Sequence, residues 1–196
     1  MQKNDELQVT WHVTLDLLVL RYMAQKIHAH LLNSAATVTL PSVHYMEEYR
    51  SQIHRIVIYG RQEFFLKESL HFVGFISGVQ EHVSQATIQE IHRVDKIIIG
   101  ELTGNAGLLS YSSMKLRNGH WYNLVLLRDQ AAKAFFKECS THRYAAYQLS
   151  TQYYAWIRLH NGVMPCGLAG NDMVVQSTKY YTFPEIGQQP LRQELL

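Results

Sequence analysis

The residue of this chain whose chemistry stands out is Asn123, which lies in the otherwise apolar segment HWYNLVLL at residues 120–127. A side-chain amide has two N–H donors and a carbonyl acceptor, and burying them without partners costs free energy. Two uses account for such an amide. It hydrogen-bonds to neighbouring groups in an ordinary core, for instance to Ser112, or it orients a carbonyl or hydroxyl group of a substrate. The second use makes Asn123 a candidate catalytic residue, and both uses remain open.

The turn predicted at Asn118-Gly119 decides which residues accompany Asn123. Asn-Gly is typical of a two-residue type I′ turn, because both central residues of that turn have positive φ. With this turn, Met114 pairs with Asn123, and Trp121 lies on the same face of the hairpin. That face is an apolar wall with a single amide, as small-molecule pockets have. We therefore predict that Trp121 and Met114 bind the substrate.

A second candidate for acid–base chemistry is His142, which follows Ser140 and Thr141 at the start of a predicted helical turn. The positive end of a helix dipole disfavours a cationic imidazole. A neutral imidazole there serves as a base near pH 7 or as an iron ligand, which makes His142 the second candidate catalytic residue. The alternative is a polar residue that faces solvent near a helix N-terminus.

The segment YYAWIRLH at residues 153–160 predicts a strand that places four candidate binding residues on one face. These substrate-binding candidates are Tyr154, Trp156, Arg158 and His160. Arg158 would lie beside an acidic group of the substrate. The alternatives are ordinary aromatic packing for Tyr154 and Trp156, and a sheet edge that reaches water for Arg158 and His160.

The 11 histidines do not form a complete set of metal ligands in the sequence. His12 and Asp16 are spaced i and i+4 on a predicted helix, which is half a site, and His28 and His30 point to different sides. We therefore predict no metal site. Motifs of the GxSxG, P-loop, GxGxxG and HExxH types do not occur, so common hydrolase, NTPase, dinucleotide-binding and metalloprotease assignments lack support.

Apolar periodicity and turn signals predict the elements that position these residues. Residues 6–32 indicate a long amphipathic helix, with a strand over 9–15 as the competing interpretation. The remaining predicted elements are a helix at 44–53 capped by Ser42, strands at 55–60 and 71–78, a helix at 84–99 capped by Ser84, strands at 108–117 and 120–127, a helix from Asp129 to about 149 that pauses at 139–141, a strand at 153–160 ended by Asn161-Gly162, and a strand at 173–183.

The order of these elements from residue 71 predicts an α+β fold. It is the ferredoxin-like β-α-β-β-α-β pattern, in which helices cover one face of an antiparallel sheet. We predict three regions: a mainly helical N-terminal region at 1–66, the ferredoxin-like domain at 67–162, and a C-terminal extension at 163–196 with a further strand. That strand either covers the sheet, extends it or exchanges with a partner.

The segment WYNLVLLRDQAAKAFFKECSTHRYAAY, taken with this element order, resembles the dimeric α+β barrel superfamily of antibiotic-biosynthesis monooxygenases and haem-binding relatives. The resemblance covers residues 70–162 and is one of pattern. It implies a sheet that forms an α+β barrel, a homodimer, and a mostly apolar pocket for an aromatic or polycyclic substrate. It implies either no cofactor or haem, which His142 or His160 would ligate.

Composition narrows the classes of partner and compartment. A net charge of +2 with 17% charged residues gives no basic patch, so we expect no nucleic-acid partner. The N-terminal residues lack the apolar run of a signal peptide, and no stretch reaches the roughly 18 apolar residues of a membrane span, so we expect no membrane partner. Two cysteines without a CxxC spacing favour free thiols and the cytoplasm.

The function predicted from these observations is that of a small-molecule enzyme with a mostly apolar barrel pocket. The resemblance makes it a monooxygenase, cofactor-free or haem-associated, that acts on a hydrophobic aromatic substrate. The alternative is a non-catalytic module that binds a ligand in the same barrel, or binds a protein partner through the N-terminal helix.

Overall fold

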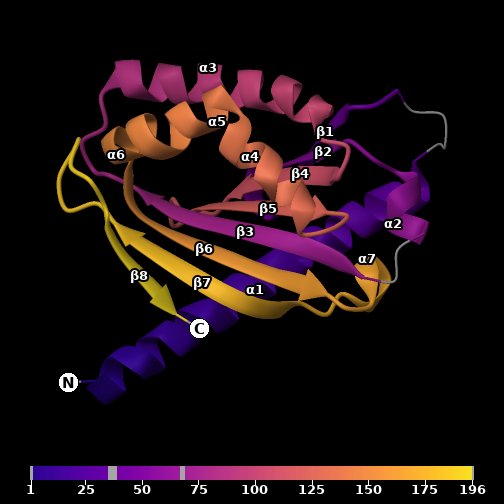
Figure 1. Ribbon diagram of the computed structural model, residues 1–196, viewed down its shortest axis with the longest axis horizontal. Helices are drawn as coiled ribbons and strands as arrows, with labels where there is room; N and C mark the ends of the chain where they lie inside the picture. The colour runs from indigo at the N-terminus through magenta and orange to yellow at the C-terminus, as the bar shows by residue number, and fades with distance from the viewer. Residues whose placement is uncertain (1, 35–38, 67–68, 196) are drawn as a thin grey trace.

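Eight strands make one antiparallel sheet (Figure 1), and most of them, such as β2 and β3, are rich in β-branched or aromatic residues. The computed structural model describes residues 2–34, 39–66 and 69–195. The spatial order of the strands is β1-β2-β4-β5-β3-β6-β7-β8. Their bounds are Ser42–Glu48 (β1), Gln52–Ile58 (β2), Leu70–Val79 (β3), Leu108–Lys115 (β4), Trp121–Leu127 (β5), Tyr154–Met164 (β6), Val174–Thr182 (β7) and Leu191–Leu195 (β8).

Helices cover both faces of this sheet (Figure 1). The long helix α1 crosses one face, and α3 lies on the other face together with the helices α4 to α6. The α-helices are Gln2–Asn33 (α1), Gln62–Leu66 (α2), Gln85–Glu101 (α3), Ala134–Glu138 (α4), Ser140–Tyr144 (α5), Ser150–Tyr153 (α6) and Gly167–Gly170 (α7), with 3-10 turns at Tyr49–Ser51, Leu102–Gly104 and Ala131–Lys133 and a π-helical turn at Ala145–Leu149. Within the described residues, none of the helices is long and apolar enough to span a membrane.

The predicted fold class, a ferredoxin-like sheet that forms an α+β barrel, is wrong. The chain is α+β, but its sheet is a single open row of eight strands. β1 and β2 extend the sheet beyond β4, and β7 and β8 extend it beyond β6. A sheet closes into a barrel only if its two edge strands pair with each other, and here β1 and β8 lie at opposite edges.

Part of the difference in the number of strands comes from residues 44–53, which the sequence predicts to be a helix. They form most of β1, the turn Tyr49–Ser51 and the start of β2. Along β1, exposed and half-buried residues alternate, which is the period of a strand with one face on the protein. β8 at Leu191–Leu195 was not predicted, and β6 continues past Asn161-Gly162 to Met164.

Several predicted elements are confirmed. α1 covers the predicted helix at 6–32, so the competing strand over 9–15 is wrong. The strands predicted at 55–60 and 71–78 are β2 and β3, and β7 extends the sheet as one of the alternatives had it. Ser84 caps α3 through its hydroxyl, which accepts a hydrogen bond from Thr87 N at 3.0 Å. Asp129 accepts from Ala132 N at 3.0 Å at the next helical turn.

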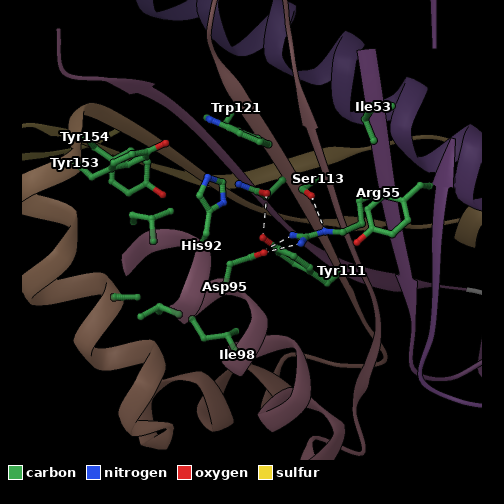
Figure 2. Close-up of a pocket in the computed structure, with 15 residues that line it drawn as sticks. Ile53, Arg55, His92, Asp95, Ile98, Tyr111, Ser113, Trp121, Tyr153 and Tyr154 are labelled. Atoms are coloured by element: carbon green, nitrogen blue, oxygen red, sulfur yellow. Dashed lines mark hydrogen bonds and ion pairs between the residues drawn. The ribbon is translucent and has the colours of Figure 1, made fainter. Parts of the chain in front are cut away.

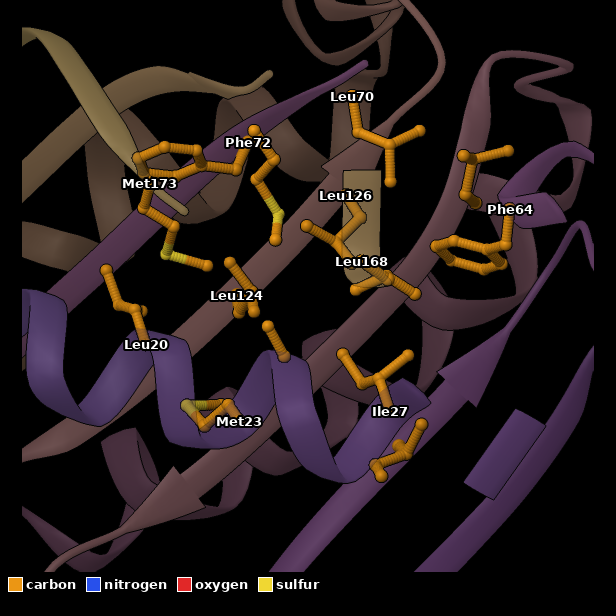
Figure 3. Close-up of a cluster of buried hydrophobic side chains, with 14 of the residues drawn as sticks. Leu20, Met23, Ile27, Phe64, Leu70, Phe72, Leu124, Leu126, Leu168 and Met173 are labelled. Carbon is orange, nitrogen blue, oxygen red and sulfur yellow. The ribbon is translucent and has the colours of Figure 1, made fainter. Parts of the chain in front are cut away.

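The main core lies between α1 and the sheet (Figure 3). Leu20, Met23 and Ile27 of α1 are fully buried against strand residues that include Leu124. Gly74 of β3 permits this close approach, because a Cβ there would lie 2.5 Å from Leu20 Cδ1. The buried side of α1 therefore includes only some of its leucines, among them Leu20 and Leu31.

Leu15 and Leu18 belong to the apolar periodicity that predicted α1, yet they remain 40% and 57% exposed. Asp16, by contrast, is fully buried on the side of α1 that faces the sheet. A carboxylate is buried only when it is paired and hydrogen-bonded, so its partners on the sheet determine which side of α1 is covered.

The hairpin between β4 and β5 is shifted by one residue from the predicted register. Gly119 has φ +86° and donates its N–H to Leu116 O at 2.9 Å, while Leu116 N donates to His120 O at 2.9 Å. This is a three-residue loop with glycine in the left-handed region, not the predicted two-residue turn. Asn123 therefore pairs with Ser113 instead of Met114. A shift of one residue moves every partner to the other face.

Candidate functional site

A cavity of about 300 Å³, here called the inner cavity, lies between α3 and the sheet (Figure 2). β2 contributes Arg55 to its lining, and α3 contributes His92 and Asp95. The other lining residues are Tyr45, Ile53, Ile91, Val94, Ile98, Tyr111, Ser113, Trp121, Asn123, Ala145, Tyr153 and Tyr154. Ligand pockets have volumes of about 300–1,000 Å³ and mostly apolar walls with a few polar groups, and the inner cavity has both properties.

The charged groups of the inner cavity neutralise each other. Arg55 of β2 donates two hydrogen bonds to Asp95 of α3, with Nη1 to Oδ2 at 2.5 Å and Nη2 to Oδ1 at 2.9 Å. Arg55 Nε also donates to Ser113 Oγ at 3.1 Å. Burial is the largest single cause and lowers the pKa of Arg55, but the hydrogen bond to Asp95 and the charge interactions with Tyr111, Asp95 and Tyr45 together outweigh it, so the pKa is raised. The pair therefore adds polarity to the wall without adding net charge.

The amide of Asn123 is half satisfied. The hydroxyl of Tyr111 donates a hydrogen bond to Asn123 Oδ1 at 3.1 Å. This bond fixes the orientation of the amide, so its nitrogen, Nδ2, points away from Tyr111. Within the described part of the chain, Nδ2 has no hydrogen-bond acceptor. Burial is the main cause that raises the pKa of Tyr111, to about 12, so its hydroxyl stays protonated and keeps donating at neutral pH.

Aromatic rings make up another wall of the inner cavity (Figure 2). The rings of Tyr153 and Tyr154 lie edge to face with centroids 4.9 Å apart, and Phe75 meets Tyr154 edge to face at 5.5 Å. Burial raises the pKa of Tyr154 and, with a smaller opposing effect of a hydrogen bond with Trp121, that of Tyr153. These rings are neutral and present both edges and faces, which suits a planar aromatic ligand.

Among the predicted site residues, Asn123, Trp121 and Tyr154 lie together at the inner cavity. Met114 does not. The shifted hairpin register places Met114 on the opposite face of β4, where it pairs with Tyr122 and packs in the core beneath α1.

Arg158 and His160 lie on the other face of the sheet, which α1 covers. Trp156 lies on the same side of β6 as these two, but at the end of the sheet, where it lines a second hollow together with Trp121 and Tyr153. A β-bulge in β6 opposite Gly78 and Val79 adds one residue between Tyr154 and Trp156, which reverses the side of the sheet that Tyr154 faces. The prediction that all four share one face is therefore wrong. The guanidinium of Arg158 stacks over the ring of Trp156, with Cζ 4.3 Å from the ring centroid.

On the α1 face, three side chains surround the carboxylate of Asp16. Arg158 donates to it from Nε at 2.6 Å, Tyr122 donates from its hydroxyl at 3.0 Å, and His160 Nε2 lies 3.0 Å away. Behind them, Thr178 bonds to the other ring nitrogen of His160 at 2.8 Å. Both carboxylate oxygens of Asp16 and both ring nitrogens of His160 are engaged within the protein, so we assign the cluster a structural role.

His142, predicted as a base or an iron ligand, does not line the inner cavity. Its ring packs against Phe136 at 5.4 Å between centroids, and burial is the main cause that lowers its pKa. The other candidate ligand, His160, is fully buried with both ring nitrogens engaged. These residues do not fit a haem. Within residues 2–34, 39–66 and 69–195, no three His, Cys, Asp or Glu side chains are grouped as metal ligands.

Sequence reasoning missed Arg55, His92, Asp95, Tyr111 and Ser113. The signal for two of them was present. Arg55 opens the apolar run RIVIYG, and Asp95 interrupts the apolar residues of α3, so each is a charge at a position where burial is expected. Arg55 and Asp95 are 40 positions apart in the chain, so their ion pair could be predicted only if the packing of α3 on β2 were known.

A scan against protein-family models, a search of curated proteins and a search of solved structures each found no match to this chain.

Proposed function

We propose that this chain binds a mostly apolar, aromatic small molecule in the inner cavity. The observation that carries the proposal is the amide of Asn123, whose Nδ2 has no acceptor among the described residues and whose position borders an aromatic-lined cavity. Asn123 is half-buried, so in the free protein its Nδ2 is open to water. A ligand acceptor that pairs with Nδ2 replaces that hydrogen bond to water and fixes the orientation of the ligand in the cavity.

The hydrogen bonds of the cavity define the group that the ligand needs. Because Tyr111 occupies Asn123 Oδ1, the amide offers a donor, so the matching ligand atom is an acceptor such as a carbonyl oxygen. Arg55 and Asp95 cancel in charge, so the part of the ligand that enters the inner cavity is neutral. An aromatic ketone meets both requirements.

The test uses prodan, a neutral naphthyl ketone whose fluorescence responds to its surroundings and to hydrogen bonding at its carbonyl. We expect saturable binding to the wild-type protein. Asn123→Ala should weaken binding about five-fold, as expected for the loss of one neutral hydrogen bond of about 1 kcal/mol. Asn161→Ala is the matched control, because Asn161 lies on β6 and does not line the inner cavity. Equal affinities for the two variants would contradict the proposed role of Asn123, and no binding by the wild-type protein would contradict the proposed function.

A monooxygenase activity at the same site is the second candidate, and the observation in its favour is His92. This histidine of α3 lines the inner cavity that Asn123 also borders. An imidazole can accept a proton from an acidic C–H group of an aromatic substrate. The resulting carbanion reduces O2, so that one oxygen atom becomes a carbonyl oxygen of the product and the other leaves as water. His92→Gln should abolish oxygen uptake with anthrone as the probe, while prodan, whose carbonyl pairs with Asn123, should still bind. Oxygen uptake equal to that of the wild-type protein would contradict this activity.

The homodimer and the cytoplasmic location remain proposals. Cys139 and Cys166 are free thiols, which supports a reducing compartment. Native mass spectrometry of the purified protein measures the subunit count directly, and a mass of one chain at micromolar concentration would contradict the homodimer.

A further inference from the structure

A second hollow of about 490 Å³, here called the outer pocket, adjoins the inner cavity. It lies between the tip of the β4–β5 hairpin, the end of β3 and the first half of α3. Three residues, His92, Trp121 and Tyr153, line both hollows. A ligand longer than one aromatic ring system therefore has a place to extend past Trp121.

The outer pocket differs from the inner cavity in charge. It is lined by Lys115, and its lining contains no Asp or Glu. The ammonium of Lys115 lies 5.7 Å from the centroid of the Trp121 ring and forms no ion pair within the described residues. In the inner cavity, by contrast, Arg55 is already paired with Asp95. Of the two hollows, the outer pocket is therefore the one with a cation, Lys115, that has no acidic partner.

His120 adds a hydrogen-bond donor to the outer pocket. The Asn118 side chain accepts from His120 N at 3.0 Å through Oδ1, which leaves its Nδ2 3.1 Å from His120 Nδ1. Nδ1 is therefore the acceptor, and the proton of a neutral ring is on Nε2. Burial, with Arg158 as the next cause, lowers the pKa of His120 and favours this neutral form. The ring of Trp156 holds the imidazole edge to face at 4.8 Å.

We infer that the inner cavity and the outer pocket form one binding site for an aromatic acid. Its ring system occupies the inner cavity, and its anionic group occupies the outer pocket beside Lys115 and His120. This inference rests on the proposed function and adds the charge and the orientation of the ligand. Carboxylate and sulfonate share the required chemistry, which is a negative group with several acceptor oxygens.

Two fluorescent probes that differ only in charge test the inference. 8-Anilinonaphthalene-1-sulfonate carries a sulfonate, and N-phenyl-1-naphthylamine is the same ring system without it. We expect the wild-type protein to bind the sulfonate more tightly. Lys115→Gln should weaken sulfonate binding about three-fold, as expected for one exposed charge pair, and leave binding of the neutral probe unchanged. Because the interaction is exposed, 1 M NaCl should remove the same preference in the wild-type protein.

Arg117→Gln is the matched control, because Arg117 is an exposed cation on the same hairpin that lines neither hollow. It should change neither affinity. An unchanged ratio of the two affinities in Lys115→Gln, or an equal loss in Arg117→Gln, would overturn the inference while the proposed function stands. If neither probe binds to a wild-type protein that binds prodan, the inference is overturned and the proposed function stands; if prodan does not bind either, both are overturned.

Discussion

Asp16 of α1 and Arg158 of β6, which are 142 residues apart in the chain, form a buried two-point ion pair. The distances are 2.6 Å from Nε to Oδ2 and 2.9 Å from Nη2 to Oδ1. Tyr122 of β5 bonds to the same carboxylate at 3.0 Å, so a single residue of the helix connects it to two strands. This connection fixes the side of α1 that meets the sheet and holds the core that lies behind the candidate site.

Removing the negative charge of this pair should destabilise the fold. In Asp16→Asn, the buried guanidinium of Arg158 keeps its charge and loses its counter-ion, a change that costs about 3 kcal/mol of unfolding free energy. Urea unfolding measures the change. Asp172→Asn, which alters an exposed carboxylate outside this cluster, should leave the midpoint in place. A loss below about 1 kcal/mol in Asp16→Asn would show that Arg158 reaches water in the folded protein.

The stability should also fall on mild acidification, in part because of His54. This histidine is fully buried, and its Nε2 lies 2.6 Å from Ser112 Oγ. Burial lowers the pKa of His54, and the opposing effect of Glu48 is smaller. The folded pKa thus lies below the unfolded value of about 6.5, so the unfolded chain takes up the proton first. Stability is complete above pH 6.5 and decreases as the pH falls below it.

The measurement for His54 compares urea unfolding at pH 7.5 and pH 5.5. The wild-type protein should lose more stability between these values than His54→Gln does, since glutamine keeps a hydrogen-bonding group beside Ser112 but does not titrate. His82→Gln, at an exposed position, should retain the wild-type difference. The same pH dependence in His54→Gln as in the wild-type protein would rule out His54 as a cause.

The local elements of this fold could be predicted from the sequence, and the pairings between them could not. Periodicity placed α1 and most strands, but periodicity reports only that a helix has an apolar side. The side of α1 that faces the sheet also depends on Asp16, whose partner Arg158 is distant in the chain. The sequence showed Asp16 only as half of a metal site with His12.

The candidate site was predicted in part for the same reason. Asn123, Trp121 and Tyr154 were recognised because a polar or aromatic residue in an apolar strand is visible locally. The partners of Asn123 depended on the hairpin register, and one extra loop residue exchanged Met114 for Ser113. Asn-Gly is compatible with both loops, since in the observed loop only Gly119 has positive φ.

The loop conformation gives a prediction of its own. Gly119 has φ +86°, which is unfavourable for a residue with a Cβ, so Gly119→Ala should lower the unfolding free energy by about 1 kcal/mol. Gly100 is the opposite case, because it lies within α3 and a Cβ there meets no atom within 4 Å. Gly100→Ala should stabilise the protein by about 0.5–1 kcal/mol. Thermal unfolding that shifts in the same direction for both variants would contradict this account of the hairpin.

The charge balance of the inner cavity can be changed with one substitution in α3. Asp95→Asn leaves Arg55 without a counter-ion at the cavity wall, where the two side chains are 16% and 32% exposed. Because both side chains are less than a third exposed, the loss of this two-point pair should cost about 1–3 kcal/mol of stability, and urea unfolding checks that the variant is folded before binding is measured. The inner cavity then carries a positive charge. Binding of 8-anilinonaphthalene-1-sulfonate should become about three-fold tighter, and binding of N-phenyl-1-naphthylamine should not change.

The control for this substitution is Glu90→Gln, which removes an acidic group from the same helix but away from both hollows. Glu90 pairs with Arg93 at 2.7 Å on the outer side of α3, so its loss changes the net charge of the protein by the same amount. If both variants tighten sulfonate binding equally, the effect comes from net charge and the ligand does not meet Arg55. If only Asp95→Asn does so, the ligand lies against the Arg55–Asp95 pair, and the neutrality of that pair in the native protein is what keeps an anionic group in the outer pocket.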